Sequence, residues 1–256
     1  MYSTTRVTLI VGASSGIGQA AATRVAQDGS GVIVTYNSNK DGALETVRRV
    51  EEAGGTAVAL PLDLGAPATF PAFRADVERA LATTWDTDRL TGLVNNAGAG
   101  TSALVEDSTE ELLDSVYGVL FKGPYLLTGA LIPILADGGA VVNTSSNSAR
   151  WSGLTAGYSA YGSMKAALTM FTRYLAKELG DRRIRVNTVS PGPTRTPFAG
   201  RVFEEQPEVT ASFEGLTALG RLGEADDAGS VIAFLVSDAS RWVTAQDIEV
   251  SGGMRL

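Results

Sequence analysis

Short apolar runs alternate with amphipathic segments along almost the whole chain. Several of the runs are apolar throughout, which is typical of strands that are buried on both faces. The runs predict strands at residues 6–11, 32–36, 57–61, 92–95, 140–144, 185–190 and 247–250. In the segments between them, the spacing of apolar positions predicts helices at residues 18–27, 41–53, 68–83, 109–118, 160–179 and 225–236.

This regular alternation predicts an α/β fold with a doubly wound, parallel, seven-stranded sheet and helices on both of its faces. The 256 residues show no composition shift and no linker, so we expect a single Rossmann-type domain over residues 1–256. Residues 191–223 form the longest stretch without a strand pattern. Irregular segments of that length are usually functional, and we expect a substrate lid at about residues 194–220.

One apolar stretch, Val116–Ala136, has the length of a membrane span. Lys122 in its middle, together with Pro124 and Pro133, argues against a span and favours a helix that faces the core or a partner subunit. The apolar run within residues 1–16 is too short for a secretory signal and leads directly into glycine-rich sequence. We therefore expect a cytoplasmic protein with no membrane partner.

Composition narrows the chemistry further. The 28 acidic and 21 basic side chains give a net charge of -7, so a nucleic-acid partner is not expected. The chain has no cysteine and no histidine, which excludes disulfides, thiolate nucleophiles and Ser-His-Asp hydrolases. No metal site is predicted. Any proton transfer must use tyrosine, lysine, a carboxylate or water.

A glycine-rich turn, VGASSGIGQAA, follows the first predicted strand. Gly12, Gly16 and Gly18 would let the main chain approach a pyrophosphate at the N-terminus of the next helix. The alternative is an ordinary tight strand–helix turn, because this glycine pattern alone is weak evidence. The cofactor hypothesis also assigns Ser14, Ser15 and Ile17 of the turn to the binding site.

The end of the second predicted strand bears on the choice of dinucleotide. NAD sites often place a carboxylate here, about 20 residues after the turn, to bind the adenosine 2′-hydroxyl. This chain has Tyr36, followed by Asn37, Ser38 and Asn39, and Lys40 could hold a 2′-phosphate. We therefore predict NADP(H) over NAD(H), with NAD(H) as the alternative. A solvated Lys40 at a helix start is the competing interpretation.

Several further motifs occur in a fixed order. They are NNAG at residues 95–98, YGSMK at 161–165, RVNTVSPG at 185–192, LGRLGEADDAGSVIAFLVSDAS at 219–240 and AQDIEVSGG at 245–253. Together with the glycine turn, this set resembles the short-chain dehydrogenase/reductase family, in the branch similar to 3-oxoacyl-carrier-protein reductases. The resemblance runs almost end to end, although Val11 stands where that family usually has threonine.

The resemblance implies where the rest of the cofactor would lie. It implies adenine contacts from Asp63 and Leu64, ribose contacts from Asn96, Ala97 and Gly98, and carboxamide or phosphate contacts from Thr194 and Thr196, after Pro191 and Gly192. Asn95 is expected to brace the strands rather than to touch the ligand.

YSAYGSMK at residues 158–165 holds the candidate acid/base pair. On a helix, Tyr161 and Lys165 share one face about 6 Å apart along the axis. A free tyrosine has a pKa of about 10. A neighbouring ammonium and an oxidised nicotinamide would lower it, and Lys165 would also bind the nicotinamide ribose. Tyr161 would then exchange a proton with the substrate oxygen. Tyr158 has no such lysine, and we expect it to line the pocket or pack.

A serine should hydrogen-bond the substrate carbonyl oxygen, and the resemblance implies the second serine at the end of the fifth predicted strand. Ser146 has that position but lies 15 residues before Tyr161, whereas the family spacing is about 13. Ser148 matches the spacing but lies further along the loop. We favour Ser146 and interpret Ser152-Gly153 as an insertion.

One position departs from the family pattern. Many relatives have a catalytic asparagine where this chain has Leu120, and leucine cannot hold the water of a proton relay from Lys165. The predicted function is an NADP(H)-dependent oxidoreductase that acts on a carbonyl or secondary alcohol. The alternative is a dinucleotide-binding sensor or scaffold with little turnover, which only Leu120 supports.

The sequence does not identify the substrate itself. We expect pocket walls from residues 99–104, 150–158 and 196–219. Their side chains suggest an apolar or aromatic small-molecule carbonyl or alcohol, chiefly through Trp151, Leu154, Tyr158, Phe198 and Phe203. The two apolar helices around residues 116–136 and 160–179 predict a homotetramer or homodimer.

Overall fold

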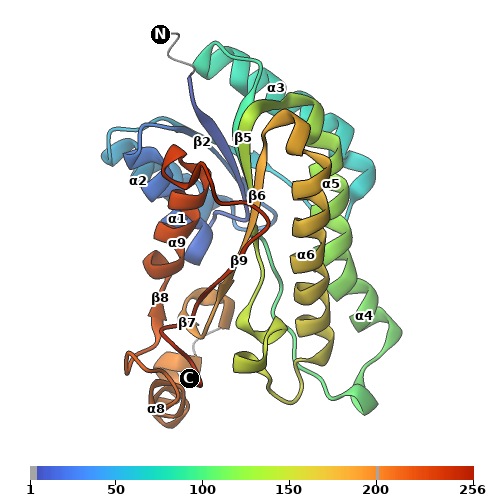
Figure 1. Cartoon of the computed structure of the whole chain (residues 1–256), viewed down its shortest axis with the longest axis vertical. Coiled ribbons are helices and arrows are strands. Elements are labelled where there is room, and N and C mark those ends of the chain that lie inside the picture. The colour runs from blue at the N-terminus through green and yellow to red at the C-terminus, as the bar shows by residue number, and fades with distance from the viewer. Residues whose placement is uncertain (1–4, 200–201) are drawn as a thin grey trace.

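The computed structural model describes residues 5–199 and 202–256 (Figure 1). The first four residues of the N-terminal segment and Gly200-Arg201 of the expected lid lie outside the described residues. Within them, the chain forms a central sheet with a layer of helices on each side (Figure 1).

The main sheet has seven parallel strands in the order β3-β2-β1-β4-β5-β6-β9, which confirms the predicted doubly wound fold. The strands are β1 Val7–Val11, β2 Gly31–Tyr36, β3 Ala57–Pro61, β4 Leu90–Asn95, β5 Leu135–Thr144, β6 Arg185–Pro191 and β9 Asp247–Val250. The order reverses between β1 and β4. Ligands of such sheets bind at this switch point, outside the carboxyl ends of the strands.

Both faces of the sheet are buried because successive strand residues point to opposite sides. Leu93 and Val141 belong to one buried apolar cluster, while their neighbours Val94 and Val142 belong to the other. Helices α3 Phe70–Trp85, α5 Gly123–Leu131 and α6 Ser159–Glu178 cover the first face, with α4 Glu110–Tyr117 beside them (Figure 1). Helices α1 Gly16–Gln27, α2 Lys40–Glu52 and α9 Ala225–Val236 cover the second.

Strand β5 begins five residues before the predicted start, at Leu135. The sequence Asp137-Gly138-Gly139 predicts a turn instead of a strand, and Gly138 does adopt a positive φ of 79°. The pairing of β4 with β5 nevertheless continues through a register shift between Leu90 and Gly92. The sequence pattern missed this part of the strand because an irregular ladder has no clean period.

Helices α4 and α5 are joined by a π-helical turn, Gly118–Lys122, and form one long rod with the short helix Ile132–Ile134. Among the described residues, this rod, Glu110–Ile134, is long and apolar enough to cross a membrane by length and composition alone. Its inner face packs in the core, where Leu127 and Leu131 are fully buried, whereas Tyr125 and Leu126 remain exposed.

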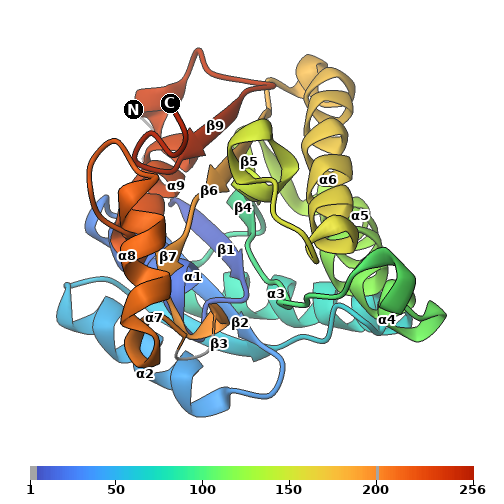
Figure 2. The same ribbon diagram turned by 90° about the horizontal axis from the view of Figure 1, so that it is seen from below.

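Below the sheet lies a small extension that carries the expected lid (Figures 1 and 2). The prediction that residues 191–223 contain no strand is wrong, since β7 Thr194–Arg195 pairs with β8 Gly223–Glu224. Strands of two residues are too short to show a hydrophobic period. Helices α7 Val202–Glu205 and α8 Pro207–Gly215 lie between them, and Phe203 meets Phe213 edge to face.

The remaining short helices lie in loops. The 3₁₀ turns are Pro67–Thr69, Val105–Asp107, Asn147–Ala149, Trp151–Gly153, Gly180–Arg182, Pro197–Ala199 and Asp238–Ser240. Two of them, Asn147–Ala149 and Trp151–Gly153, follow β5 directly and shape the loop that carries the candidate serines.

Candidate active site

A cavity of about 700 Å³ lies at the carboxyl ends of the central strands, where the switch point predicts a ligand. Nearly all of the predicted site residues line it. They are Gly12, Ser14, Ser15, Gly16, Ile17, Tyr36, Asn37, Ser38, Asp63, Leu64, Asn96, Ala97, Gly98, Ser146, Tyr161, Lys165, Pro191, Gly192, Thr194 and Thr196. Segments far apart in the chain thus meet around one space.

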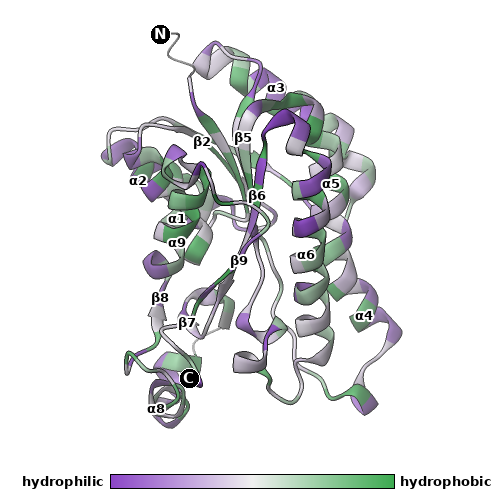
Figure 3. Ribbon diagram, in the orientation of Figure 1, coloured by the Kyte–Doolittle hydropathy of each residue, from purple (hydrophilic) through white to green (hydrophobic). Residues whose placement is uncertain are grey.

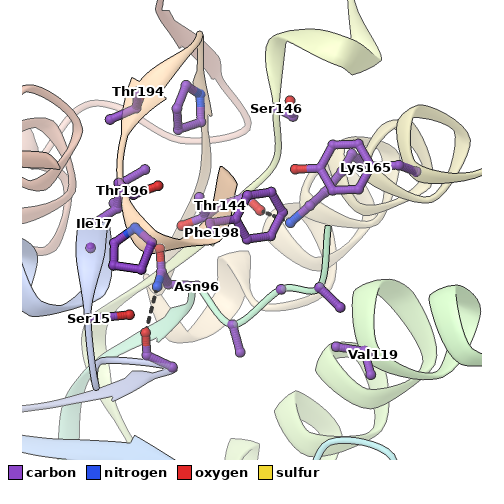
Figure 4. A pocket seen from close by; sticks show the side chains of 18 of the residues that line it. Ser15, Ile17, Asn96, Val119, Thr144, Ser146, Lys165, Thr194, Thr196 and Phe198 are labelled. Carbon is purple, nitrogen blue, oxygen red and sulfur yellow. Dashed lines mark hydrogen bonds between the residues drawn. The ribbon is translucent and has the colours of Figure 1, made fainter. Parts of the chain in front are cut away.

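The glycine turn is built for close backbone approach. Gly12 has φ +76°, and a Cβ added to it would lie 2.5 Å from the Cα of Ala97. The Asn96 side-chain amide donates to the Gly12 carbonyl at 2.8 Å (Figure 4). The NNAG loop therefore interlocks with the glycine turn. Ser15, Gly16 and Ile17, at the start of α1, line the cavity, and the N-terminus of a helix is a common binding site for the phosphate groups of a dinucleotide.

Gly18 does not line the cavity. It is buried, and a Cβ there would lie 2.3 Å from the Gly12 carbonyl oxygen. Its predicted place in the site is thus corrected to a packing position: only hydrogen fits between α1 and the turn, so Gly18 shapes the loop from behind.

Lys40 does not line the cavity either. It is the exposed first residue of α2. Asn39 lines the cavity instead, and its side chain accepts a hydrogen bond from the Gly42 N–H at 3.0 Å and donates to the Ser14 carbonyl at 3.3 Å. This capping role turns the chain into α2 and leaves the next residue facing solvent, so the predicted phosphate contact from Lys40 is not supported.

Thr194 and Thr196, for which the resemblance implies carboxamide or phosphate contacts, line the cavity after β6. Thr194 donates to the Gly192 carbonyl at 2.8 Å, which tightens the turn after β6. The Thr196 side chain would lie 3.3 Å from a Cβ added to Gly16, so it reaches across to the glycine turn. A dinucleotide could therefore extend from Asp63, near β3, to this region and be contacted along its length by the predicted residues.

Tyr161, Lys165 and Ser146 line the same part of the cavity. Figure 4 shows Lys165 and Ser146 there. Lys165 is 3% exposed, and its ammonium lies 5.8 Å from the centre of the Tyr161 ring. The ammonium donates to the Thr144 carbonyl at 2.7 Å, which anchors it at the end of β5. The predicted placement of Tyr161 and Lys165 on one face of a helix is confirmed by α6.

Burial dominates the electrostatics of this pair. It raises the pKa of Tyr161 to about 12, although a hydrogen bond with Ser146 acts in the opposite direction. Burial also lowers the pKa of Lys165 to about 8. The prediction that the Lys165 ammonium and an oxidised nicotinamide together lower the pKa of Tyr161 concerns the complex with cofactor and stays a prediction. A lowered tyrosine pKa would need the positive charge of an oxidised nicotinamide.

The geometry favours Ser146 over Ser148. Ser146 lies at the end of β5, interacts with the Tyr161 hydroxyl and accepts a hydrogen bond from the Ser148 N–H at 3.1 Å. Gly153 lets the loop fold back, since a Cβ there would lie 2.3 Å from the Asn147 carbonyl. The extra turn Trp151–Gly153 accounts for the longer spacing between Ser146 and Tyr161.

Leu120 lies in the π-helical turn and is fully buried. It forms a small apolar cluster with Val116 and Tyr161. It is also close to the lysine, because a Cβ added to Gly98 would contact the Leu120 side chain at 3.7 Å and the Lys165 ammonium at 4.0 Å. An apolar side chain thus occupies the space next to the acid/base pair where the resemblance implies an amide.

The substrate half of the cavity is apolar, as expected, but its lining differs in part. Tyr158 and Phe198 flank Tyr161, each with ring centres 6.1 Å away. Trp151 and Leu154 do not line the cavity; they are 89% and 54% exposed because the extra turn points them outward. Thr155, Val202, Val209 and Phe213 line it from within the expected wall segments 150–158 and 196–219. Val119 and Met254 also line it, although they lie outside the expected segments.

Val119 was not expected because it lies in the π-helical turn Gly118–Lys122, whose inner face does not follow the period of an α-helix. Met254 was not expected because it follows two glycines, where the sequence pattern predicts only a turn.

Comparisons with known proteins agree with this geometry. The family model described as enoyl-(acyl carrier protein) reductase matches residues 12–255. An uncharacterized oxidoreductase of Methylorubrum extorquens is 38% identical over 250 residues, which cover 98% of this chain and 98% of that protein.

Two solved structures extend the comparison. One is the promiscuous reductase LugOII, which catalyses keto-reduction at C1 during lugdunomycin biosynthesis; it is 37% identical, covers 98% of both chains and has a TM-score of 0.92. The other is the angucycline C-6 ketoreductase LanV with bound NADP, at 33% identity and a TM-score of 0.92, covering 98% of this chain and 95% of that one.

Proposed function

The chain belongs to the short-chain dehydrogenase/reductase family and is an oxidoreductase, and on that premise we propose that it is an NADP(H)-dependent ketoreductase. The observation that carries the proposal is the convergence of Ser146, Tyr161 and Lys165 in the cavity that the glycine-rich turn also lines. The two ketoreductases of known structure that resemble this chain support the same reaction class.

The proposed roles follow from the positions of the side chains. When bound, the reduced nicotinamide supplies a hydride to the carbonyl carbon. Tyr161 gives the proton of its hydroxyl to the carbonyl oxygen, so that C=O becomes CH–OH. Ser146 donates a hydrogen bond to that oxygen while charge develops on it. Lys165 stabilises the resulting phenolate through its ammonium and binds the nicotinamide ribose.

The preference for NADP(H) rests on the end of β2. Tyr36, Asn37 and Ser38 line the cavity there, and Asn39 completes the loop. These side chains offer hydrogen bonds and no negative charge to repel a 2′-phosphate. The bound NADP of LanV supports this choice, and NAD(H) is the alternative.

We expect a neutral, flat, largely aromatic ketone as substrate. The side chains around Tyr161 are Tyr158, Phe198, Phe203 and Phe213, with Val202 and Val209 from the expected lid. Among the described lining residues, the charged ones are Asp63 at the adenine end and Lys165. A charged substrate would thus lose its hydration without finding a partner.

We also expect a homo-oligomer built on α4, α5 and α6. Tyr117, Phe121 and Tyr125 follow each other at a spacing of four along one helical face, and Phe171 of α6 packs on Tyr125 with ring centres 4.7 Å apart. Leu113, Leu126, Met170 and Tyr174 add exposed apolar area beside them. A contiguous group of exposed apolar side chains on a lone subunit is typical of a protein interface.

The activity test uses NADPH absorbance with a panel of aromatic ketones. We expect turnover by the wild-type protein and a fall in kcat of about 10²- to 10⁴-fold in Tyr161→Phe, because the general acid is lost. Tyr174→Phe, on the exposed side of the same helix, should behave as wild type. Full activity in Tyr161→Phe would contradict the proposal.

The sensor or scaffold alternative predicts a different result. It requires tight NADPH binding by calorimetry together with no hydride transfer on any ketone of the panel. The retained Ser146, Tyr161 and Lys165 argue against it, because a protein that only binds the cofactor needs neither a proton donor nor a hydrogen bond to a carbonyl.

A further inference from the structure

We propose that Met254, carried by the C-terminal turn, sets the width of the substrate end of the cavity and thereby selects the size of the ketone. The inference rests on the proposed ketoreductase function and adds a specificity-determining residue from the last three positions of the chain. Its basis is that one short segment contacts the serine loop, the lid and the cavity at the same time.

Met254 is buried for a reason other than core packing. It is 3% exposed, yet it belongs to none of the three buried apolar clusters formed by the described residues. It lines the cavity instead. A long apolar side chain that faces a cavity and not the core is available to contact whatever fills that cavity.

The turn that delivers Met254 depends on two glycines. Gly252 and Gly253 have φ values of +65° and +74°. A Cβ on Gly252 would lie 2.7 Å from Thr217, and one on Gly253 would lie 2.9 Å from Ala218. Only glycine fits such backbone at such distances, so the chain after β9 is bent back under the lid at a fixed place.

The backbone of this turn is paired with the end of the lid segment. The N–H groups of Ala218 and Leu219 donate to the carbonyls of Gly253 and Gly252 at 3.2 and 3.1 Å. Met254 itself forms an antiparallel bridge with Thr217, and the Arg255 N–H donates to the Leu216 carbonyl at 2.8 Å. The turn therefore acts as an extra strand beside residues 216–219.

The side chains fix the same turn to the serine loop. The Asn147 amide, directly after Ser146, donates to the Met254 sulfur at 3.1 Å. The Arg255 guanidinium donates to the Leu154 carbonyl at 2.9 Å. Met254 thus lies against the residue that follows the proposed carbonyl donor, and its thioether cannot move without breaking a buried contact.

The chemistry of the thioether suits the proposed substrate. Methionine sulfur is polarisable and makes favourable contacts with aromatic ring edges. With Tyr158 and Phe198 beside Tyr161, and Met254 against Asn147, a flat ring system would be bounded by rings on one side and sulfur on another. The side chain of Met254 then determines how much ring fits next to Ser146.

The test measures ketone affinity in a complex that cannot react, formed by the protein, NADP⁺ and a ketone. The two ketones are α-tetralone, with two rings, and fluorenone, with three. Calorimetry of wild type, Met254→Ala and Met254→Leu should show that alanine shifts the ratio of the two Kd values about tenfold in favour of fluorenone. Leucine, of similar volume, should stay within about twofold of wild type.

Controls separate this result from misfolding. The Kd for NADP⁺ should be unchanged in both variants, and Met170→Ala, an exposed methionine on α6, should leave the ratio unchanged. If the wild-type protein reduces ketones but alanine at 254 leaves both Kd values unchanged, the inference is overturned and the proposed function stands. If the wild-type protein binds and reduces no ketone, both are overturned.

Discussion

At the scale of single residues, the burial of Lys165 lowers the stability of the folded protein, and the proposed catalytic role explains why this lysine is buried. An ammonium that is almost fully buried has lost its hydration, and one carbonyl, that of Thr144, receives its hydrogen bond. Sites of catalysis often hold such groups at the expense of stability. The cofactor-free protein should therefore be less stable than a variant without the charge.

Lys165→Met tests this cost through its pH dependence. The folded-state pKa of Lys165, about 8, lies below the ordinary value of 10.5, so the unfolded chain binds more protons between these pH values. The wild-type free energy of unfolding should thus rise relative to Lys165→Met as pH increases from 8 to 10.5, by about 3 kcal/mol at most.

Urea unfolding without cofactor at several pH values measures the difference. Lys177→Met, which removes an exposed lysine from the same helix, should show no such pH trend. If the difference in the free energy of unfolding between wild type and Lys165→Met stays constant from pH 8 to 10.5, burial of the lysine does not destabilise the protein.

The two candidate serines are distinguished by substitution. Ser146→Ala should lower kcat about 10²-fold on any ketone that the wild-type protein reduces, because the developing oxyanion loses a donor. Ser148→Ala should change kcat less than about fivefold, since its N–H, not its hydroxyl, contacts Ser146. The reverse order of effects in steady-state assays would assign the role to Ser148.

At this scale the sequence predicted the identities of the site residues better than their environments. Tyr161 and Lys165 were identified from their spacing together with the ordered motifs around them, and Asn95 does brace the strands through hydrogen bonds to Thr128 and Asn143. The raised pKa of Tyr161 could not be predicted from the sequence, because the burial of this side chain depends on segments from many parts of the chain. Lys40 was misjudged because a capping residue just before it decides its direction.

At the scale of elements, the π-helical turn Gly118–Lys122 is the least regular helical segment next to the site. Such turns are frequent at functional sites and widen the helix by one residue. Here the turn directs Leu120 inward against Tyr161 and close to Lys165. The turn thus places an apolar side chain at the position where the resemblance implies a relay asparagine.

Leu120→Asn should therefore destabilise the protein. The substitution removes fully buried apolar surface and places an amide beside Val116 and the Tyr161 ring, for a loss of about 2–4 kcal/mol in the free energy of unfolding. Leu44→Asn, on the exposed face of α2, should cost less than about 1 kcal/mol. Equal urea midpoints for the two variants would indicate a polar site around residue 120.

Most of the helices and strands could be predicted from the sequence. Strands such as β3, Ala57–Pro61, and helices such as α9, Ala225–Val236, have the predicted boundaries because their apolar pattern matches the period of the structure. The two-residue strands β7 and β8 were not predictable. Their pairing is set by the fold around them, not by a local pattern.

At the scale of the whole molecule, the two layers of helices differ in how they meet solvent. Helices α4, α5 and α6 carry both polar and apolar residues (Figure 3), and Tyr117, Tyr125 and Tyr174 on them are exposed. The lid helix α8 lies below the sheet on the side of α1 and α9, away from α5 and α6 (Figures 1 and 2), so an oligomer on the α4–α6 face would leave the lid unobstructed.

Tyr125→Glu should convert the proposed oligomer into smaller species. Tyr125 is 49% exposed on the lone subunit, and an interface would bury a carboxylate there without a partner. Size exclusion with light scattering measures the mass of wild type and variant. Leu44→Glu, away from this face, serves as the control. A wild-type mass equal to one subunit would refute the interface.

The turn at Gly252 and Gly253 has a consequence for how the protein is made. Synthesis proceeds from the N-terminus, so the adenosine end of the proposed dinucleotide site, up to Gly98, precedes its nicotinamide end at Lys165 and Thr194. The edge strand β9 and the turn that carries Met254 follow both. A nascent chain could therefore form the adenosine end of its cofactor site early, yet its substrate pocket would stay incomplete until the turn after β9 has been synthesised.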